Sequence, residues 1–224
     1  MPNGPFRRDL GPVAFGVVDP DLVARVAAAS HAALEPFLDA DWSVPARDLE
    51  WSCVRTLEHV ADSWFAHAAR ITGAPTEWFV PATLTLDDPA DNRATLLVLD
   101  ACAGLMRGAA VVGDPDSTAY HPWGASDPAG SVAMGCAEAL LHTYDVVAGL
   151  GGTWTPPDDL AAPVLTRLFD APDGVPAGEA LLWCAGRVAL PGLPRRDEWR
   201  WYGEGRSARD GEAVRPMREG EGGS

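Results

Sequence analysis

Apolar residues recur with a helical period in six segments of this chain, whereas the strict alternation typical of strands is scarce. Stretches rich in glycine and proline separate these segments, and both residues end helices. The pattern therefore predicts an all-α fold. The expected helices cover residues 19–39, 45–72, 91–112, 130–150, 157–170 and 176–190.

The first four expected helices are long and the last two are short. Four helices of about 18 to 26 residues, joined by one short and two longer connections, are typical of a four-helix bundle with crossover connections. The two short helices are extra C-terminal elements. We expect one bundle domain over residues 19–202, preceded by an N-terminal extension at residues 1–18. Residues 203–224 lack apolar periodicity and are expected to be disordered.

The charge of the chain narrows the range of partners. It has 17 basic and 32 acidic residues, which gives a net charge of −15 at pH 7. Such a surface repels nucleic-acid phosphates and anionic membranes, so we expect neither as a partner. The N-terminal stretch lacks the apolar core of a signal peptide, and no segment reaches about 18 uninterrupted apolar residues. These features predict a cytoplasmic protein.

The four cysteines are far apart in the sequence and form no CxxC pair. Each lies among apolar residues with a helical period, which is the context of a small buried side chain. We therefore expect neither disulfide nor metal chemistry at Cys53, Cys102, Cys136 and Cys184.

The fourth expected helix carries polar residues and glycines on one narrow side. On a helical wheel they occupy an arc of about 80°, and almost every other position is apolar. The stripe either faces water or lines a groove or cavity. Because the polar face of a surface helix is usually wider, we favour a helix surrounded by its neighbours. The arc comprises Ser131, Gly135, Glu138, His142, Asp145 and Gly149.

Glu138 and His142 lie one turn apart on this arc. A buried carboxylate needs a compensating partner, and a divalent metal bound by both side chains would supply one. Since this pair is common in helices, a third ligand must come from another segment. The apolar period of the second helix places His59 away from the centre of its apolar face. From that period alone, a solvent-facing His59 is at least as consistent as a ligand.

Longer motifs carry a resemblance to a known family. The stretch from Trp51 to Ala61 has its tryptophan eight residues before a mid-helix histidine, with Leu57 between them. The stretch HPWGASDPAGSVAMGCAEALLHTYDVVAGLG contains the pattern ExxxHxxD followed by glycines. Together with LLWCAGRVALPG and WRW near the C-terminus, they resemble the DinB-like superfamily, specifically its mycothiol-dependent maleylpyruvate isomerase branch. The likeness covers about residues 23–201.

The resemblance implies a DinB-like bundle in which a histidine of the second helix joins a glutamate and a histidine of a later helix around zinc or nickel. The matching positions are His59, Glu138 and His142. Three protein ligands leave one coordination position open, as in catalytic sites. By family likeness the metal would hold the thiol of mycothiol, whose thiolate attacks a small electrophilic metabolite. The reaction would be that of an isomerase or an S-transferase.

The chain also departs from the best-known members of that branch, which carry a separate C-terminal domain that contributes to substrate binding. Here only a short segment follows the fourth helix, so maleylpyruvate is not the expected substrate. Two other functions stay open. One is a thiol-independent tailoring enzyme, such as a cyclase or a hydrolase, and the other is a non-catalytic protein that binds a metal or a small ligand.

Three further polar residues are candidates for supporting roles, whereas a fourth, Asp62, is not. Asp145, one turn beyond His142, is either an acceptor for a histidine N–H or a residue of the groove. His121 is either a general acid or base, or a loop residue bonded to the backbone. Arg187 would bind a carboxylate of the substrate or cofactor, or satisfy charge at a helix end. Asp62 is expected to be a solvated charge.

Aromatic side chains are expected around the pocket. Trp51 lies about two turns before His59 in the expected helix. Tyr120 and Trp123 lie on the loop that precedes the fourth helix. The expected partners are a small-molecule substrate and a low-molecular-weight thiol, and the chain is compatible with a monomer or a homodimer.

Overall fold

The structure is a computed structural model that describes residues 18–89 and 91–204. The expected N-terminal extension and C-terminal tail therefore lie outside the described residues, apart from Val18, Gly203 and Glu204. Gly203 and Glu204 are hydrogen-bonded to other described residues. The Gly203 amide donates a hydrogen bond to the carbonyl of Trp123, and Arg167 donates one to the carbonyl of Glu204.

The described part of the chain is all-α, as the sequence predicts. It contains six α-helices and one short 3-10 helix, and three isolated β-bridges are its only sheet-like pairings. The elements are α1 Pro20–Leu34, η1 Glu35–Phe37, α2 Cys53–Gly73, α3 Asn92–Val112, α4 Pro128–Gly149, α5 Asp158–Leu168 and α6 Ala177–Cys184.

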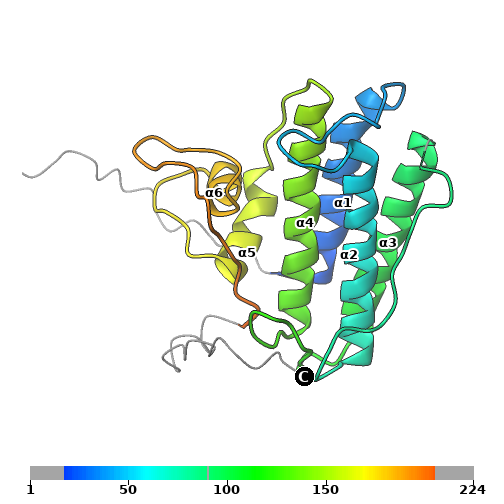
Figure 1. The fold of residues 1–224 in the computed structure, drawn as a ribbon. Coiled ribbons are helices and arrows are strands. Elements are labelled where there is room, and N and C mark those ends of the chain that lie inside the picture. Colours follow the sequence, from blue (N-terminus) through cyan, green and yellow to red (C-terminus); the bar gives the residue numbers. More distant parts are fainter. Residues whose placement is uncertain (1–17, 90, 205–224) are drawn as a thin grey trace, which may run out of the picture.

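Helices α1 to α4 form a four-helix bundle, and α5 and α6 lie beside α4 at one side of it (Figure 1). Helices α1 and α2 each pack against both α3 and α4. Because α5 also packs against α4, neighbours surround α4 on most of its circumference. This arrangement confirms the expectation that the fourth helix is buried, and it explains why apolar residues occupy nearly every side of it.

One connection crosses the full length of the bundle. The side-chain amide of Asn92, at the start of α3, donates to the carbonyls of Leu38 and Ala40 just after α1. At the other end of α3, a Cβ on Gly113 would lie 2.5 Å from Ile71 near the end of α2. Helices α2 and α3 are therefore parallel, and residues 74–89 return along the bundle (Figure 1). The expected four-helix bundle has its long crossover here, and the other two connections each join helices at one end of the bundle.

The crossover segment is bound to acidic side chains of α2. The amide of Leu84 donates to Asp62 at 2.7 Å, and the amide of Leu86 donates to Glu58 at 2.9 Å. The expectation that Asp62 is a solvated charge was therefore wrong, because a loop without a regular ladder needs acceptors for its amides. These bonds hold the segment beside the face of α2 that carries His59.

Local capping chemistry shifts two helix boundaries from their expected places. Helix α2 begins at Cys53 rather than near residue 45, because the Ser52 hydroxyl caps it by accepting from the Arg55 amide. Helix α6 ends at Cys184 rather than near residue 190. Gly186 follows with φ of +69°, a conformation that glycine adopts without strain.

The cysteines and α3 complete the comparison with the sequence. All four cysteines are buried and free, as expected. By length and composition α3 is apolar enough to cross a membrane, although the sequence has no uninterrupted apolar run of that length. Packing of α3 against α1 and α2 accounts for its apolar inner face, and core helices of soluble proteins pass the same test.

Candidate metal centre

Three side chains from two helices converge on one point between α2 and α4. Nε2 of His59 lies 3.4 Å from Oε2 of Glu138, and Nε2 of His142 lies 3.1 Å from the same oxygen. One ligand atom from each residue lies within 4.8 Å of the other two. The structure thus turns His59 toward α4, an orientation that the helical period alone left open.

The donor set fits a divalent transition metal. Two imidazole nitrogens and one carboxylate oxygen are ligands that zinc accepts, and donors around a tetrahedral ion with bonds of about 2.1 Å lie about 3.4 Å apart. The separations of 3.1 Å and 3.4 Å at Glu138 are close to that value. The side chain of His59 is 31% exposed, whereas that of His142 is only 10% exposed. A small ligand can therefore reach the cluster from the His59 side.

A buried acidic residue fixes the orientation of His142. Nδ1 of His142 lies 3.1 Å from Oδ2 of Asp145, and the Arg187 guanidinium donates to the same oxygen at 3.0 Å. Histidine ligands of metals commonly donate their second N–H to a carboxylate, which directs the other nitrogen at the ion. Asp145 thus has the position of the acceptor considered from the sequence. Arg187 is bound to Asp145 and to the Ala185 carbonyl.

The neighbours of Glu138 and His142 favour the charged form of each side chain. Burial alone would raise the pKa of Glu138, but hydrogen bonds and charge from His142 and His59 outweigh it and hold the pKa below its ordinary value. Burial would likewise lower the pKa of His142, but Asp145 and Glu138 raise it to about 9. Without metal, His142 is therefore protonated at neutral pH. A metal held by His142 would take the place of that proton, because a ligating imidazole must be neutral.

Trp51 lies beside the cluster, although it precedes α2 instead of belonging to it. Its ring centroid is 5.2 Å from that of His59, and the Arg55 guanidinium stacks over the indole at 4.9 Å. The indole is 41% exposed. The helical spacing used in the sequence argument was wrong, but the ring of Trp51 does contact that of the partly exposed His59.

The other aromatic candidates gather near the far end of α2. Tyr120 stacks on Trp78, and Trp123 packs edge-on against Trp201. His121 accepts a hydrogen bond at Nδ1 from the Trp123 amide, which matches the loop role considered from the sequence. Burial, and then the charge of Arg70, lower the pKa of His121 to about 4. Among the described residues, Tyr120 and Trp123 have their ring contacts with other aromatic side chains, whereas the negative charge of Glu138 acts on His121 and partly offsets the lowering of its pKa.

Sequence reasoning missed a buried pair on α2. Arg70 donates from Nη1 to Nδ1 of His67 at 3.2 Å, and both residues are buried. A signal was available, because residues 59 and 70 are about three helical turns apart and therefore share a face of α2. Arg70 was not recognised because the residues around it are apolar, and an apolar pattern does not show which polar residues lack partners.

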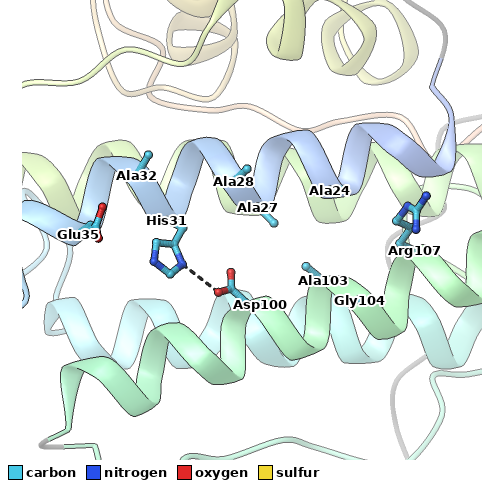
Figure 2. Close-up of a pocket in the computed structure, with 10 residues that line it drawn as sticks. All are labelled: Ala24, Ala27, Ala28, His31, Ala32, Glu35, Asp100, Ala103, Gly104 and Arg107. Carbon is cyan, nitrogen blue, oxygen red and sulfur yellow. Dashed lines mark hydrogen bonds and ion pairs between the residues drawn. The ribbon is translucent and has the colours of Figure 1, made fainter.

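A separate groove of about 500 Å³ runs between α1 and α3. Half of the residues that line it are alanines, and Figure 2 shows that His31 and Asp100, 2.9 Å apart, face each other across it. Arg107 at one end is bound to Asp21 at 2.7 Å. At this groove His31 is thus paired with Asp100 and Arg107 with Asp21, whereas the donors between α2 and α4 converge on a shared point.

Comparison with known proteins gives a fold neighbour only. No protein-family model matches the chain, and no curated protein matches it. A solved structure, described as the crystal structure of TT2238, a four-helix bundle protein, is similar to this chain with a TM-score of 0.42 and 22% sequence identity. The match covers 58% of this chain and 98% of that one. The level of similarity carries no argument about function.

Proposed function

We propose that this chain is a metal-dependent enzyme that holds zinc or nickel with His59, Glu138 and His142. The observation that carries the proposal is the convergence of their three donor atoms within 4.8 Å, from two helices that are distant in sequence. Asp145 and Arg187 support it, because they direct Nε2 of His142 toward the other two donors. The arrangement is consistent with a DinB-like bundle.

The residues present leave room for a reacting ligand. Three protein donors are the usual number at a catalytic zinc site, and the exposed edge of His59 is the side from which a ligand enters. When bound, such a metal supplies Lewis acidity, which lowers the pKa of a coordinated thiol or water. Trp51 excludes water from one side of the exposed histidine and offers a flat apolar surface to a small molecule.

The nucleophile comes from outside the chain. All four cysteines are buried, and burial raises the pKa of Cys53 and of Cys184 to about 11, so neither supplies a thiolate at neutral pH. The resemblance to mycothiol-dependent isomerases favours a low-molecular-weight thiol, with mycothiol as the first candidate. The reaction is then thiol addition to an electrophilic metabolite, which ends as S-transfer or continues to isomerisation.

The burial of all four cysteines also supports a second function. With no thiolate of its own, the chain can use water in place of a thiol, as a hydrolase or a cyclase of specialised metabolism would. A non-catalytic role in binding a metal or a small ligand is the remaining candidate. Thiol dependence separates the first function from these two.

The experiment loads the protein with cobalt(II) and records its absorption spectrum as mycothiol is added. Direct coordination of the thiol is expected to produce a sulfur-to-cobalt charge-transfer band. A second assay measures whether an activated alkene is consumed only when the thiol is present. The His142→Ala variant loses both signals, and the His31→Ala variant, altered in the α1/α3 groove, keeps both. Full thiol-dependent turnover by His142→Ala would refute the metal mechanism. Thiol-independent turnover by wild type would replace the first function with the second.

A further inference from the structure

A buried arginine has donors that nothing in the described chain accepts. Among the described residues, the buried side-chain atoms without a hydrogen-bond partner are Oγ of Ser30 and Nε and Nη2 of Arg70. Arg70 is only 2% exposed. Burial lowers the pKa of its guanidinium to about 10, so the group is still charged at neutral pH. An uncompensated buried charge is strongly destabilising, which points to a partner outside the described residues.

The two unpartnered nitrogens form one edge of the guanidinium. Nη1 is already used, because it donates to Nδ1 of His67. Nε–H and one terminal N–H of arginine are parallel donors whose spacing matches the two oxygens of a carboxylate. His67 does not neutralise the positive charge of the Arg70 guanidinium. Burial, and then the charge of Arg70, lower the pKa of His67 to about 3, so its imidazole is neutral at pH 7.

Arg70 lies on the same face of α2 as His59. Eleven residues correspond to about three helical turns and a rise of about 16 Å. Long side chains on a helix lean toward its N-terminus, and this direction takes the guanidinium of Arg70 back toward His59. The free edge therefore lies on the order of 10 Å from the metal centre.

Small side chains occupy the face between the two residues. Ser63 and Ala66 lie between His59 and Arg70 on α2, and both are partly exposed. Helix α4 flanks this face on one side. The crossover segment, bound to Asp62 through the Leu84 amide, flanks it on the other. Because Arg70 itself is only 2% exposed, an elongated small molecule with one end at His59 must pass between α2 and its neighbours for its other end to reach Arg70.

We propose that the free edge of Arg70 binds a carboxylate of the compound on which the metal centre acts, so that the substrate is an elongated organic anion. The identity of that compound as the substrate rests on the proposed function, but carboxylate binding at Arg70 does not require the metal. One guanidinium edge beside a neutral histidine matches a planar, singly charged carboxylate better than a doubly charged phosphate.

The test measures anion binding to the metal-free full chain by calorimetry and by thermal unfolding, at constant ionic strength. The probes are sodium acetate, sodium adipate and inorganic phosphate. Wild type and the surface control Arg107→Met are expected to bind the carboxylates and to be stabilised by them. Arg70→Met is expected to bind them about tenfold to a hundredfold more weakly. Arg70→Lys, which keeps the charge but lacks the fork, is expected to be weakened as well.

Three results would overturn the proposal: equal carboxylate affinity in Arg70→Met and wild type, binding of phosphate but neither carboxylate, or a large loss of thermal stability of Arg70→Met in anion-free buffer. The last result would show that the guanidinium has partners within the folded chain. If Arg70→Met does not fold, Arg70→Lys provides the same comparison. Failure of the metal centre is recognised separately, because wild type would then bind no metal while its carboxylate affinity still depended on Arg70.

Discussion

Two pairs of helices in this bundle each place a histidine opposite an acidic residue, and the two pairs differ in burial. Between α1 and α3, His31 and Asp100 lie 2.9 Å apart with side chains 39% and 45% exposed. Between α2 and α4, His59 and Glu138 lie 3.4 Å apart, and Glu138 is only 17% exposed. A second histidine and a second carboxylate, His142 and Asp145, continue the buried array.

The comparison shows that a histidine and an acid in contact do not by themselves indicate a metal site. A solvated pair such as His31–Asp100 contributes little to stability and needs no further partner, because water compensates both groups. The buried array must be compensated within the protein, and its donors are oriented toward one point. Burial and convergence therefore distinguish the candidate centre from the groove.

The largest expected effect is the loss of metal affinity when a converging donor is removed. Glu138→Gln and His142→Ala are each expected to weaken zinc binding by about a hundredfold or more, since two donors cannot replace three. The matched groove variants Asp100→Asn and His31→Ala are expected to leave it unchanged. Competition with a chromogenic chelator measures all four affinities. Equal losses in the two regions would contradict the assignment.

Asp145→Asn is expected to have the next largest effect. It keeps the size of the side chain but weakens the bond that orients His142 and leaves Arg187 without its carboxylate partner. Changes of this kind next to a metal ligand lower metal affinity about tenfold to a hundredfold. The same chelator competition tests the variant, and circular dichroism checks that it folds. Unchanged affinity in a folded variant would mean that Asp145 does not support the centre.

Metal affinity of the centre between α2 and α4 is expected to rise with pH. The pKa of His142 is raised to about 9 in the metal-free fold, from an unfolded value of about 6.5. Its contribution to the stability of the metal-free protein is therefore full below pH 6.5 and is lost as pH rises through 9. Metal binding displaces this proton, so zinc affinity gains about tenfold per pH unit below 9. Calorimetry in buffers of different ionisation enthalpy detects the released proton, and its absence would contradict the raised pKa.

The last prediction concerns stability instead of metal affinity and involves two glycines, one in each region. Gly104 on α3 has open space around it, so Gly104→Ala is expected to stabilise the fold by about 1 kcal/mol through helix propensity. At Gly135 on α4, an added Cβ would lie 2.9 Å from Trp64, whose indole donates to the Gly135 carbonyl. Gly135→Ala is expected to destabilise by about 1–3 kcal/mol. Urea unfolding of both variants checks the opposite signs.

The helices were predictable from the sequence because their apolar periods are long and their ends carry capping residues. The surrounded position of α4 followed from its narrow polar arc, and the structure confirms it. Helix boundaries were less certain. Nothing in the apolar period separated the loop at residues 45–52 from the helix that follows, and the Ser52 cap shows only in the structure.

Local sequence alone brings together only two of the three residues of the candidate centre. Glu138 and His142 share a helix, so their spacing puts them together, but the approach of His59 depends on how α2 packs against α4. The period of α2 left that orientation open, and the family resemblance suggested it. The unpartnered edge of Arg70 could not be predicted, because whether a buried donor finds an acceptor depends on every segment that packs around it.

The most direct test of the central account is the metal content of the wild-type protein, purified without chelator and dialysed against zinc and nickel in turn. The account predicts about one tightly bound equivalent per chain, four-coordinate with nitrogen and oxygen donors by X-ray absorption. No stoichiometric metal after reconstitution, or a sulfur-rich coordination shell from the cysteines, would contradict it.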